Sequence, residues 1–199
     1  MDTREQVIET TQRLIHTRGS KVTTMDEVAM EAGVSKRTLY ELFEDKEHLL
    51  AECIRWTNQK SRDAFACIAL DAENVIDALL KVRRFQSKEL HKIKFDFFLE
   101  LKRFYPQVYK ETVVKMTDER KEYMKMFFAR GQQEDLFLKD INTDLICEMS
   151  DIIMLGIHEN GWTLVDKYSG EDCFQVAVLY FIRGLCTEKG IKYIDNYYN

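Results

Sequence analysis

Two adjacent basic residues, Lys36 and Arg37, open a short amphipathic segment in the stretch AGVSKRTLYELFEDKEHLL, residues 32–50. The hydroxyl of Thr38 and the phenol of Tyr40 follow. Ammonium and guanidinium groups bind phosphate oxygens or guanine edges, and hydroxyl groups donate to phosphate. These side chains could therefore bind nucleic acid, although a Lys–Arg pair on a helix is by itself more often solvated surface.

The rest of the chain is acidic. Its 199 residues carry a formal net charge of −5, so nucleic-acid contact would need a local basic patch. One proline and eight glycines favour long helices over a turn-rich β fold. Apolar residues make up 45% of the chain, enough for a buried core.

Signals for other chemistry are weak. The five cysteines are scattered without a CxxC pair, which argues against a zinc site and favours reduced thiols. The stretch HENGW, which begins at His158, lacks the second histidine of a zinc-protease motif. The sequence contains no nucleophile elbow or dinucleotide fingerprint. We expect no enzyme activity, no metal and no cofactor.

The sequence shows no targeting or membrane signal. The opening MDTREQVIETTQ has no apolar core of a signal peptide. No run approaches the ~18 apolar residues of a membrane-spanning helix. We expect a cytoplasmic protein.

Capping residues and apolar spacing predict helices nearly throughout. Thr3 and Gln6 fit a capping box at the start of a first helix, and Thr24 and Glu27 fit a clearer one at the start of a second. Gly33 would close that second helix after about two turns.

A third and a fourth helix follow the glycine. Ser35 is a good N-cap for the third, and Asp45 for the longer fourth. Leu39, Leu42 and Phe43 recur at i, i+3 and i+4, so they must point inward. The two bases and the tyrosine are then left on or near the outer surface.

A helix, a tight glycine turn and a second helix form the layout of a helix-turn-helix, here at about residues 24–43. The second helix of this motif enters the major groove with its N-terminal residues. Amide groups at the start of the fourth helix, near Lys46, would form a phosphate cradle. A DNA-binding unit is therefore predicted.

The segment TTMDEVAMEAGVSKRTLYELFEDKEHLL, residues 23–50, closely resembles the DNA-binding region of TetR-family transcriptional regulators. The matching points are T-x-x-E-V-A, the A-G-V-S turn, T-L-Y with a following Phe, and K-E-x-L-L. The resemblance covers about the first sixty residues. It implies an all-α protein with a three-helix DNA-binding domain over residues 1–61 and a helical dimerisation and ligand-binding domain over residues 62–199.

The resemblance also implies roles for single residues. Tyr40 would contact a phosphate, and Lys46 the DNA backbone beside it; a partly buried place at the core edge is the alternative for Tyr40. Family members often have a small residue where Arg37 stands, so we expect Arg37 to add a base contact. The expected DNA contacts are Thr24, Ser35, Lys36, Arg37, Thr38, Tyr40 and Lys46.

Acidic residues follow the two bases more densely than in basic versions of this region. They should weaken non-specific binding, which is mostly phosphate electrostatics. These residues are Glu41, Glu44, Asp45 and Glu47.

The last two predicted helices cover residues 142–167 and 171–188. The second is apolar almost all round and needs cover on more than one side. A partner subunit would supply that cover in a homodimer; the alternative is that both helices are deep core. The expected interface residues are Ile153, Gly156, Ile157, Phe174, Val178 and Phe181.

A small-molecule effector site is predicted where aromatic and polar-tipped side chains gather, because pockets are mostly apolar with few polar anchors. Ordinary core packing is the alternative. The candidates are His91, Phe95, Phe98, His158 and Trp162.

These features predict a one-component transcriptional regulator, most simply a repressor. It would bind a pseudo-palindromic operator as a homodimer and release it on binding an effector. Two other hypotheses are a helical enzyme or carrier with its site in the aromatic region, and an adaptor that binds protein through its apolar C-terminal helices.

Overall fold

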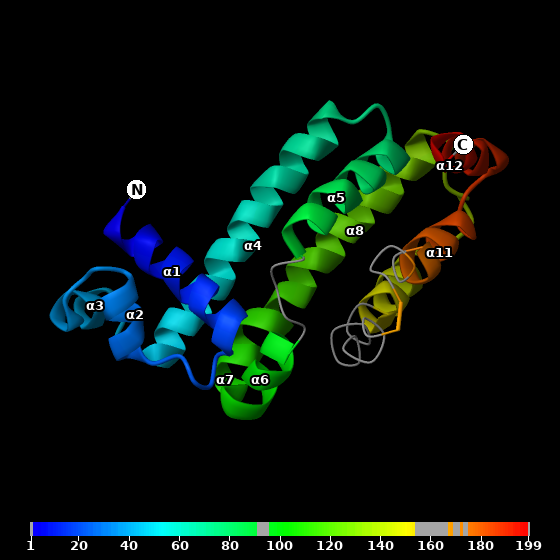
Figure 1. The fold of residues 1–199 in the computed structure, drawn as a ribbon. Helices are drawn as coiled ribbons and strands as arrows, with labels where there is room; N and C mark the ends of the chain where they lie inside the picture. The colour runs from blue at the N-terminus through cyan, green and yellow to red at the C-terminus, as the bar shows by residue number, and fades with distance from the viewer. Residues whose placement is uncertain (1, 91–95, 154–166, 169–171, 173–174, 199) are drawn as a thin grey trace. The chain divides into compact units, whose positions relative to one another are not determined.

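The computed structural model is built from helices in the part of the chain that it describes, residues 2–90, 96–153, 167–168, 172 and 175–198 (Figure 1). Within those ranges the only extended pairing is an isolated antiparallel bridge between Phe137 and Cys186. The predicted all-α class is confirmed. Among the described helices, none is long and apolar enough to cross a membrane.

The N-terminal helices follow the predicted order. They are α1 (Thr3–Arg18), α2 (Met25–Glu31), α3 (Lys36–Leu42) and α4 (Lys46–Asp71). The helices on either side of the glycine turn have only seven residues each, whereas α4 has 26. Two such short helices depend on caps and tertiary packing, because isolated helices of this length are unstable in water.

The remaining elements are longer or continuous with one another. They are α5 (Val75–Leu90), α6 (Asp96–Phe104), α7 (Pro106–Tyr109), the π-helical turn η1 (Lys110–Val114), α8 (Lys115–Gln133), a helix over residues 143–153, the π-helical turn η2 (Gln175–Leu179), α11 (Tyr180–Arg183) and α12 (Glu188–Tyr198). Pro106 lies in the first turn of its helix, as predicted, because its fixed φ and missing N–H are tolerated there.

Polar caps begin the helices around the glycine turn. The Thr24 hydroxyl accepts from the N–H of Glu27, and the Glu27 carboxylate accepts from the N–H of Thr24, so this capping box is confirmed. The side chains of Ser35 and Asp45 accept the N–H three residues further on, at 3.0 and 2.8 Å. Each cap satisfies a donor that the helix start would otherwise leave unpaired.

The start of α1 differs from the prediction. Asp2 is its N-cap and makes no side-chain capping bond, so the capping box expected from Thr3 and Gln6 is wrong. The Gln6 amide instead donates to the Ala32 carbonyl at 2.9 Å. A contact that spans 26 positions in the sequence has taken the group that the local motif would have used.

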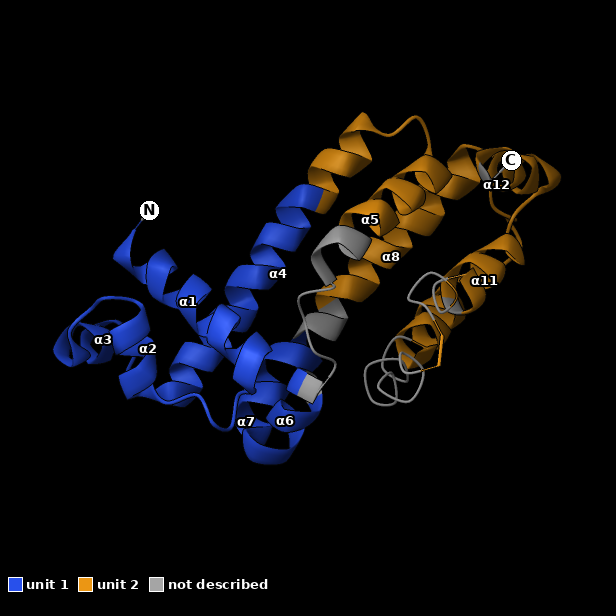
Figure 2. Cartoon of the chain, in the orientation of Figure 1, with its two compact units in different colours: residues 1–64, 91–116 blue, residues 65–90, 117–199 orange. Residues whose placement is uncertain are grey.

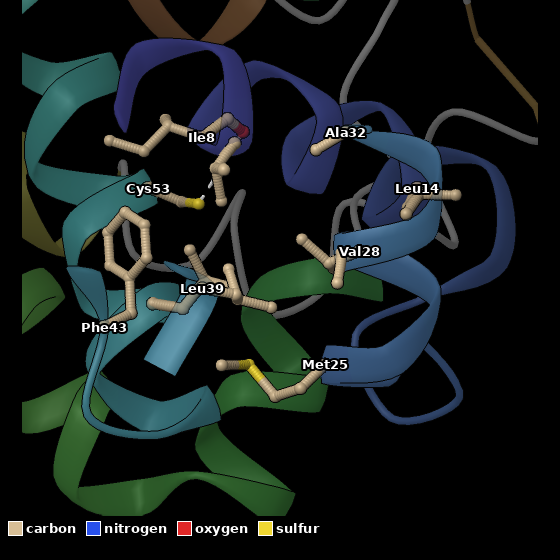
Figure 3. Close-up of a cluster of buried hydrophobic side chains, with 11 residues drawn as sticks. Ile8, Leu14, Met25, Val28, Ala32, Leu39, Phe43 and Cys53 are labelled. Carbon is tan, nitrogen blue, oxygen red and sulfur yellow. Dashed lines mark hydrogen bonds between the residues drawn. The ribbon is translucent and has the colours of Figure 1, made fainter. Parts of the chain in front are cut away.

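The chain divides into two compact units (Figure 2): residues 1–64 with 91–116, and residues 65–90 with 117–199. The first unit holds a core in which α1 to α4 meet, with Leu39 and Phe43 fully buried from the α3 side (Figure 3). The Cys53 thiol lies in this core, 3.8 Å from the Ile8 carbonyl that accepts its hydrogen bond. Its burial raises the pKa of this thiol, so it is held as an uncharged apolar side chain.

A second cluster of the same unit joins α6 and α7 to the N-terminal helices. Leu101 and Val108 are buried there against Ile15, Leu50 and neighbouring residues of α4. For this reason the described residues 96–116 group with the N-terminal helices by packing. The functional division at residues 61 and 62 stays a prediction.

The second unit is organised around aromatic packing at the end of α8. The ring centroids of Phe128 and Phe137 lie 5.5 Å apart, and both side chains are fully buried. The Phe137 ring lies so close to α8 that a Cβ on Gly131 would fall 2.1 Å from its Cδ2 atom. Only glycine fits at this position without a shift of the ring.

The structure corrects the prediction of a single helix over residues 171–188, because a separate helix, α12, follows it. Helical structure ends at Arg183, and α12 begins at Glu188 after a turn. The Thr187 hydroxyl accepts from the Gly190 N–H at 3.3 Å and donates to the Asp135 carbonyl at 2.7 Å. A threonine cap before apolar residues at helical spacing was the missed signal.

Replacing Gly131 by alanine should lower the free energy of unfolding by about 1–3 kcal/mol, because the new Cβ would collide with the Phe137 ring. Urea denaturation followed by circular dichroism would measure the change. Gly184→Ala is the matched control: its nearest neighbour would lie at 3.4 Å, so the change should stay below about 1 kcal/mol. Equal midpoints for the two variants would contradict the close approach.

Candidate nucleic-acid interface

The turn between α2 and α3 depends on Gly33. Its φ is +66°, a conformation that L side chains rarely adopt. The turn is closed by the Val34 N–H, which donates to the Ala29 carbonyl at 3.0 Å. Because Ala29, Ala32 and Leu39 are buried on either side of this turn, the two short helices can pack closely and α3 keeps one face outward.

The outward face of α3 carries the residues expected to bind DNA. The Arg37 side chain is 87% exposed and Tyr40 is 51% exposed. Lys36 is also exposed, one turn before Tyr40 on the same side. Thr38 is half-buried, and its hydroxyl lies 2.8 Å from that of Ser35. The structure thus brings the basic side chains of Lys36 and Arg37 and the Tyr40 phenol to one surface. The hydroxyls of Ser35 and Thr38 are hydrogen-bonded within the cap of α3.

The two basic side chains of this surface are each paired with a carboxylate side chain of the same unit. The Lys36 ammonium lies 2.6 Å from an Asp26 carboxylate oxygen, and the Arg37 Nε lies 2.8 Å from Glu41. All four side chains are more than half exposed. Such pairs are weak in water, so phosphate can compete for the bases.

The start of α4 lies beside this motif and holds Lys46. Its ammonium donates to the Lys21 carbonyl at 3.2 Å and lies 5.4 Å from the centroid of the Tyr105 ring. The Glu44 N–H donates to Nδ1 of His48 at 3.3 Å. The first two contacts join Lys46 to the turn after α1 and to Tyr105, the residue between α6 and α7, whereas the third stays within the start of α4.

Thr24 lies exposed at the start of α2. Its N–H, and then its hydroxyl, hydrogen-bond to the Glu27 carboxylate and lower the pKa of Glu27. Thr24 therefore fixes the first turn of α2, and its hydroxyl is already engaged there.

Sequence reasoning missed a contact between the turn after α1 and α6. Ser20 is fully buried, and its N–H and hydroxyl both donate to the Glu100 carboxylate of α6 at 2.5 Å. Gly19, with φ +96°, allows the approach, since a Cβ there would lie 2.8 Å from Glu100. No local pattern announces a bond between residues 80 positions apart.

Most of the residues predicted to line an effector site lie outside the part of the chain that the structure describes. His91, Phe95, His158 and Trp162 lie outside the described residues, and Phe98 lies within α6. This site stays a prediction.

Of the six residues predicted to form the dimer interface, the structure describes three. Gly156, Ile157 and Phe174 lie outside the described residues. Ile153 is half-buried in the described helix over residues 143–153. Val178 and Phe181 are half-buried against the core of their own unit. The dimer contacts stay a prediction.

Exposed apolar side chains lie on the same helical segments. They recur at i, i+4 and i+7 in one segment and at i and i+4 in the other: Leu145, Met149 and Ile152, and Val176 and Tyr180. These side chains face outward in the isolated chain, in contrast to Val178 and Phe181.

The capped α2, the positive-φ turn and the exposed α3 define a helix-turn-helix domain. Residues 7–53 match the family model described as bacterial regulatory proteins, tetR family. The resemblance of this segment to the TetR family is therefore confirmed. A comparison with curated proteins gives no match.

Solved structures of TetR-like regulators share the fold over nearly the whole chain. The fatty acid degradation regulator FadR from Bacillus halodurans is 20% identical with a TM-score of 0.74, over 93% of this chain and 97% of that one. Regulatory protein TetR from Rhodobacter sphaeroides is 15% identical with a TM-score of 0.73, over 91% and 97%. Ketosteroid transcriptional regulator KstR2 of Mycobacterium tuberculosis is 20% identical with a TM-score of 0.56, over 94% and 96%.

The Glu27 capping contact predicts a pH-dependent stability. The pKa of Glu27 is lowered in the folded state. The contact therefore stabilises the folded protein above pH 4.5, the ordinary pKa, and this contribution is lost as the pH falls through the lowered pKa of the folded state. Glu27→Gln should therefore be less stable than wild type at pH 7, and the gap should close below pH 4.5. Thermal denaturation at several pH values would measure it, with Glu44→Gln as the control outside the capping box. A gap independent of pH would contradict the contact.

Proposed function

We propose that this protein is a one-component transcription regulator that binds a pseudo-palindromic DNA operator as a homodimer. It acts most simply as a repressor in the cytoplasm and releases DNA when a small molecule binds. No catalysis, metal or cofactor is part of this proposal. The observation that carries it is the exposed face of α3, where Lys36, Arg37 and Tyr40 stand on a capped and glycine-turned helix.

The proposed docking places the first turn of α3 in the major groove. Arg37 would exchange its Glu41 partner for a guanine edge or a phosphate, and Lys36 would exchange Asp26 for a phosphate. The Tyr40 hydroxyl would donate to a phosphate on the same strand. Lys46 would contact the neighbouring backbone from the start of α4.

We propose that Thr24, Ser35 and Thr38 act mainly by capping the helices that face DNA. Their hydroxyls are bonded within the caps of α2 and α3, so they fix the two helix starts at the DNA surface. A phosphate oxygen could accept from one of these hydroxyls only if its O–H turned away from the cap partner, because a hydroxyl has a single proton to donate.

A homodimer supplies the second recognition helix. Two copies of α3 must reach half-sites about one turn of DNA apart, roughly 34–36 Å. The outward-facing Leu145, Met149 and Ile152 offer an apolar stripe that a second copy would cover, with Val176 and Tyr180 beside them in the proposed interface.

The effector would act through the α6 end of the first unit. Glu100 holds the turn after α1, and Tyr105 lies over the cation of Lys46, so a shift of α6 would move both. An effector must bind the DNA-free state more tightly to change the equilibrium. FadR and KstR2 are named for fatty acid degradation and ketosteroids, and at 20% identity they carry no effector over to this chain.

Tyr40→Phe and Arg37→Ala should each weaken operator binding about tenfold, through loss of a hydrogen bond to a charged group or a base contact. Fluorescence anisotropy on DNA from upstream of the protein's own gene, with random-DNA competitor at fixed salt, would measure this. Tyr123→Phe is the control, since it removes an exposed phenol from the second unit. Unchanged binding in both α3 variants would sink the proposed docking.

Ile152→Glu should shift the protein from dimer to monomer, because it places a charge in the proposed apolar interface. Sedimentation equilibrium would show the change in mass. Leu70→Glu adds the same charge at an exposed apolar position near the end of α4 and should leave the dimer intact. Equal masses for the two variants would place the interface elsewhere.

A further inference from the structure

We propose that Asp26 is a specificity-determining residue that restrains Lys36 from binding DNA of arbitrary sequence. This inference rests on the proposed function, because it concerns the same α3 surface. It assigns a role to a residue of α2, the helix that does not itself read DNA.

The geometry gives Asp26 one evident partner. It lies in the first turn of α2, Lys36 is the first residue of α3, and the glycine turn brings their side chains together at 2.6 Å. Asp26 is not needed for capping, because Glu27 completes the box with Thr24. Its carboxylate is therefore aimed at a base of the recognition helix.

This pair does little for stability. The two side chains are 66% and 61% exposed, and exposed ion pairs contribute little to folding because water and salt screen them. A carboxylate in such a place matters more for what approaches from outside. A DNA phosphate would have to displace Asp26 from Lys36 and then remain near its negative charge.

Displacing Asp26 offsets part of the gain that Lys36 would otherwise add to non-specific binding. A free lysine that meets a phosphate releases about one counterion, so each contact steepens the fall of affinity with salt by about 0.9 in log–log slope. A lysine that leaves a carboxylate for a phosphate exchanges one ion pair for another. At a matching operator, base contacts by Arg37 and the hydrogen bond of Tyr40 would offset this cost, whereas random DNA offers no such compensation.

The test is binding to random-sequence duplex DNA over a salt series from 0.05 to 0.2 M. Asp26→Asn should bind about five- to tenfold more tightly at 0.1 M salt than wild type, with a slope steeper by about one. Glu9→Gln is the matched control. It removes one carboxylate from an exposed pair with Lys60, on α1 and α4, and should leave both quantities unchanged.

A second background separates this role from a general charge effect. In Lys36→Gln, the further change Asp26→Asn should bring no gain, because the restrained base is absent. A gain that persists there, or no gain in Asp26→Asn alone, would overturn the inference. Failure of the proposed function looks different: wild type would then bind no operator at all, whatever residue 26 is.

Discussion

The crossing of two seven-residue helices at Gly33 is the constraint on which the DNA-binding surface depends. Neither α2 nor α3 is long enough to be stable alone. Their caps and the burial of Leu39 and Phe43 hold them together, and the positive φ of Gly33 lets the chain turn between them. Once Leu39 points inward, helical spacing leaves Lys36, Arg37 and Tyr40 no place but the surface.

Electrostatics then decides how that surface can be used. The chain carries a net charge of −5. Without DNA, the basic side chains of Lys36 and Arg37 on α3 are paired with Asp26 and Glu41. A surface of this kind gains little from phosphates alone and needs hydrogen bonds to a fitting sequence. The acidic residues around α3 therefore belong to the proposed mechanism of discrimination.

The caps around the glycine turn were readable from the sequence, whereas the Thr3–Gln6 box was wrong and distant contacts could not be read at all. The caps at Thr24 and Ser35 act over three residues, so their residue types predicted them. The Glu100–Ser20 bond and the Asp26–Lys36 pair join positions 80 and 10 apart, and only the fold brings them together. The packing of residues 96–116 on the N-terminal helices has the same cause. The start of α12 was missed although Thr187 marks it.

The most direct test of the central claim is hydrogen–deuterium exchange on the protein bound to a duplex that it has itself enriched from a random library. Exchange should slow at the start of α3 and in the first turn of α4, around Lys36 and Lys46, with little direct protection in the second unit. Protection confined to the second unit, or a library from which no sequence is enriched, would contradict the claim that α3 reads DNA.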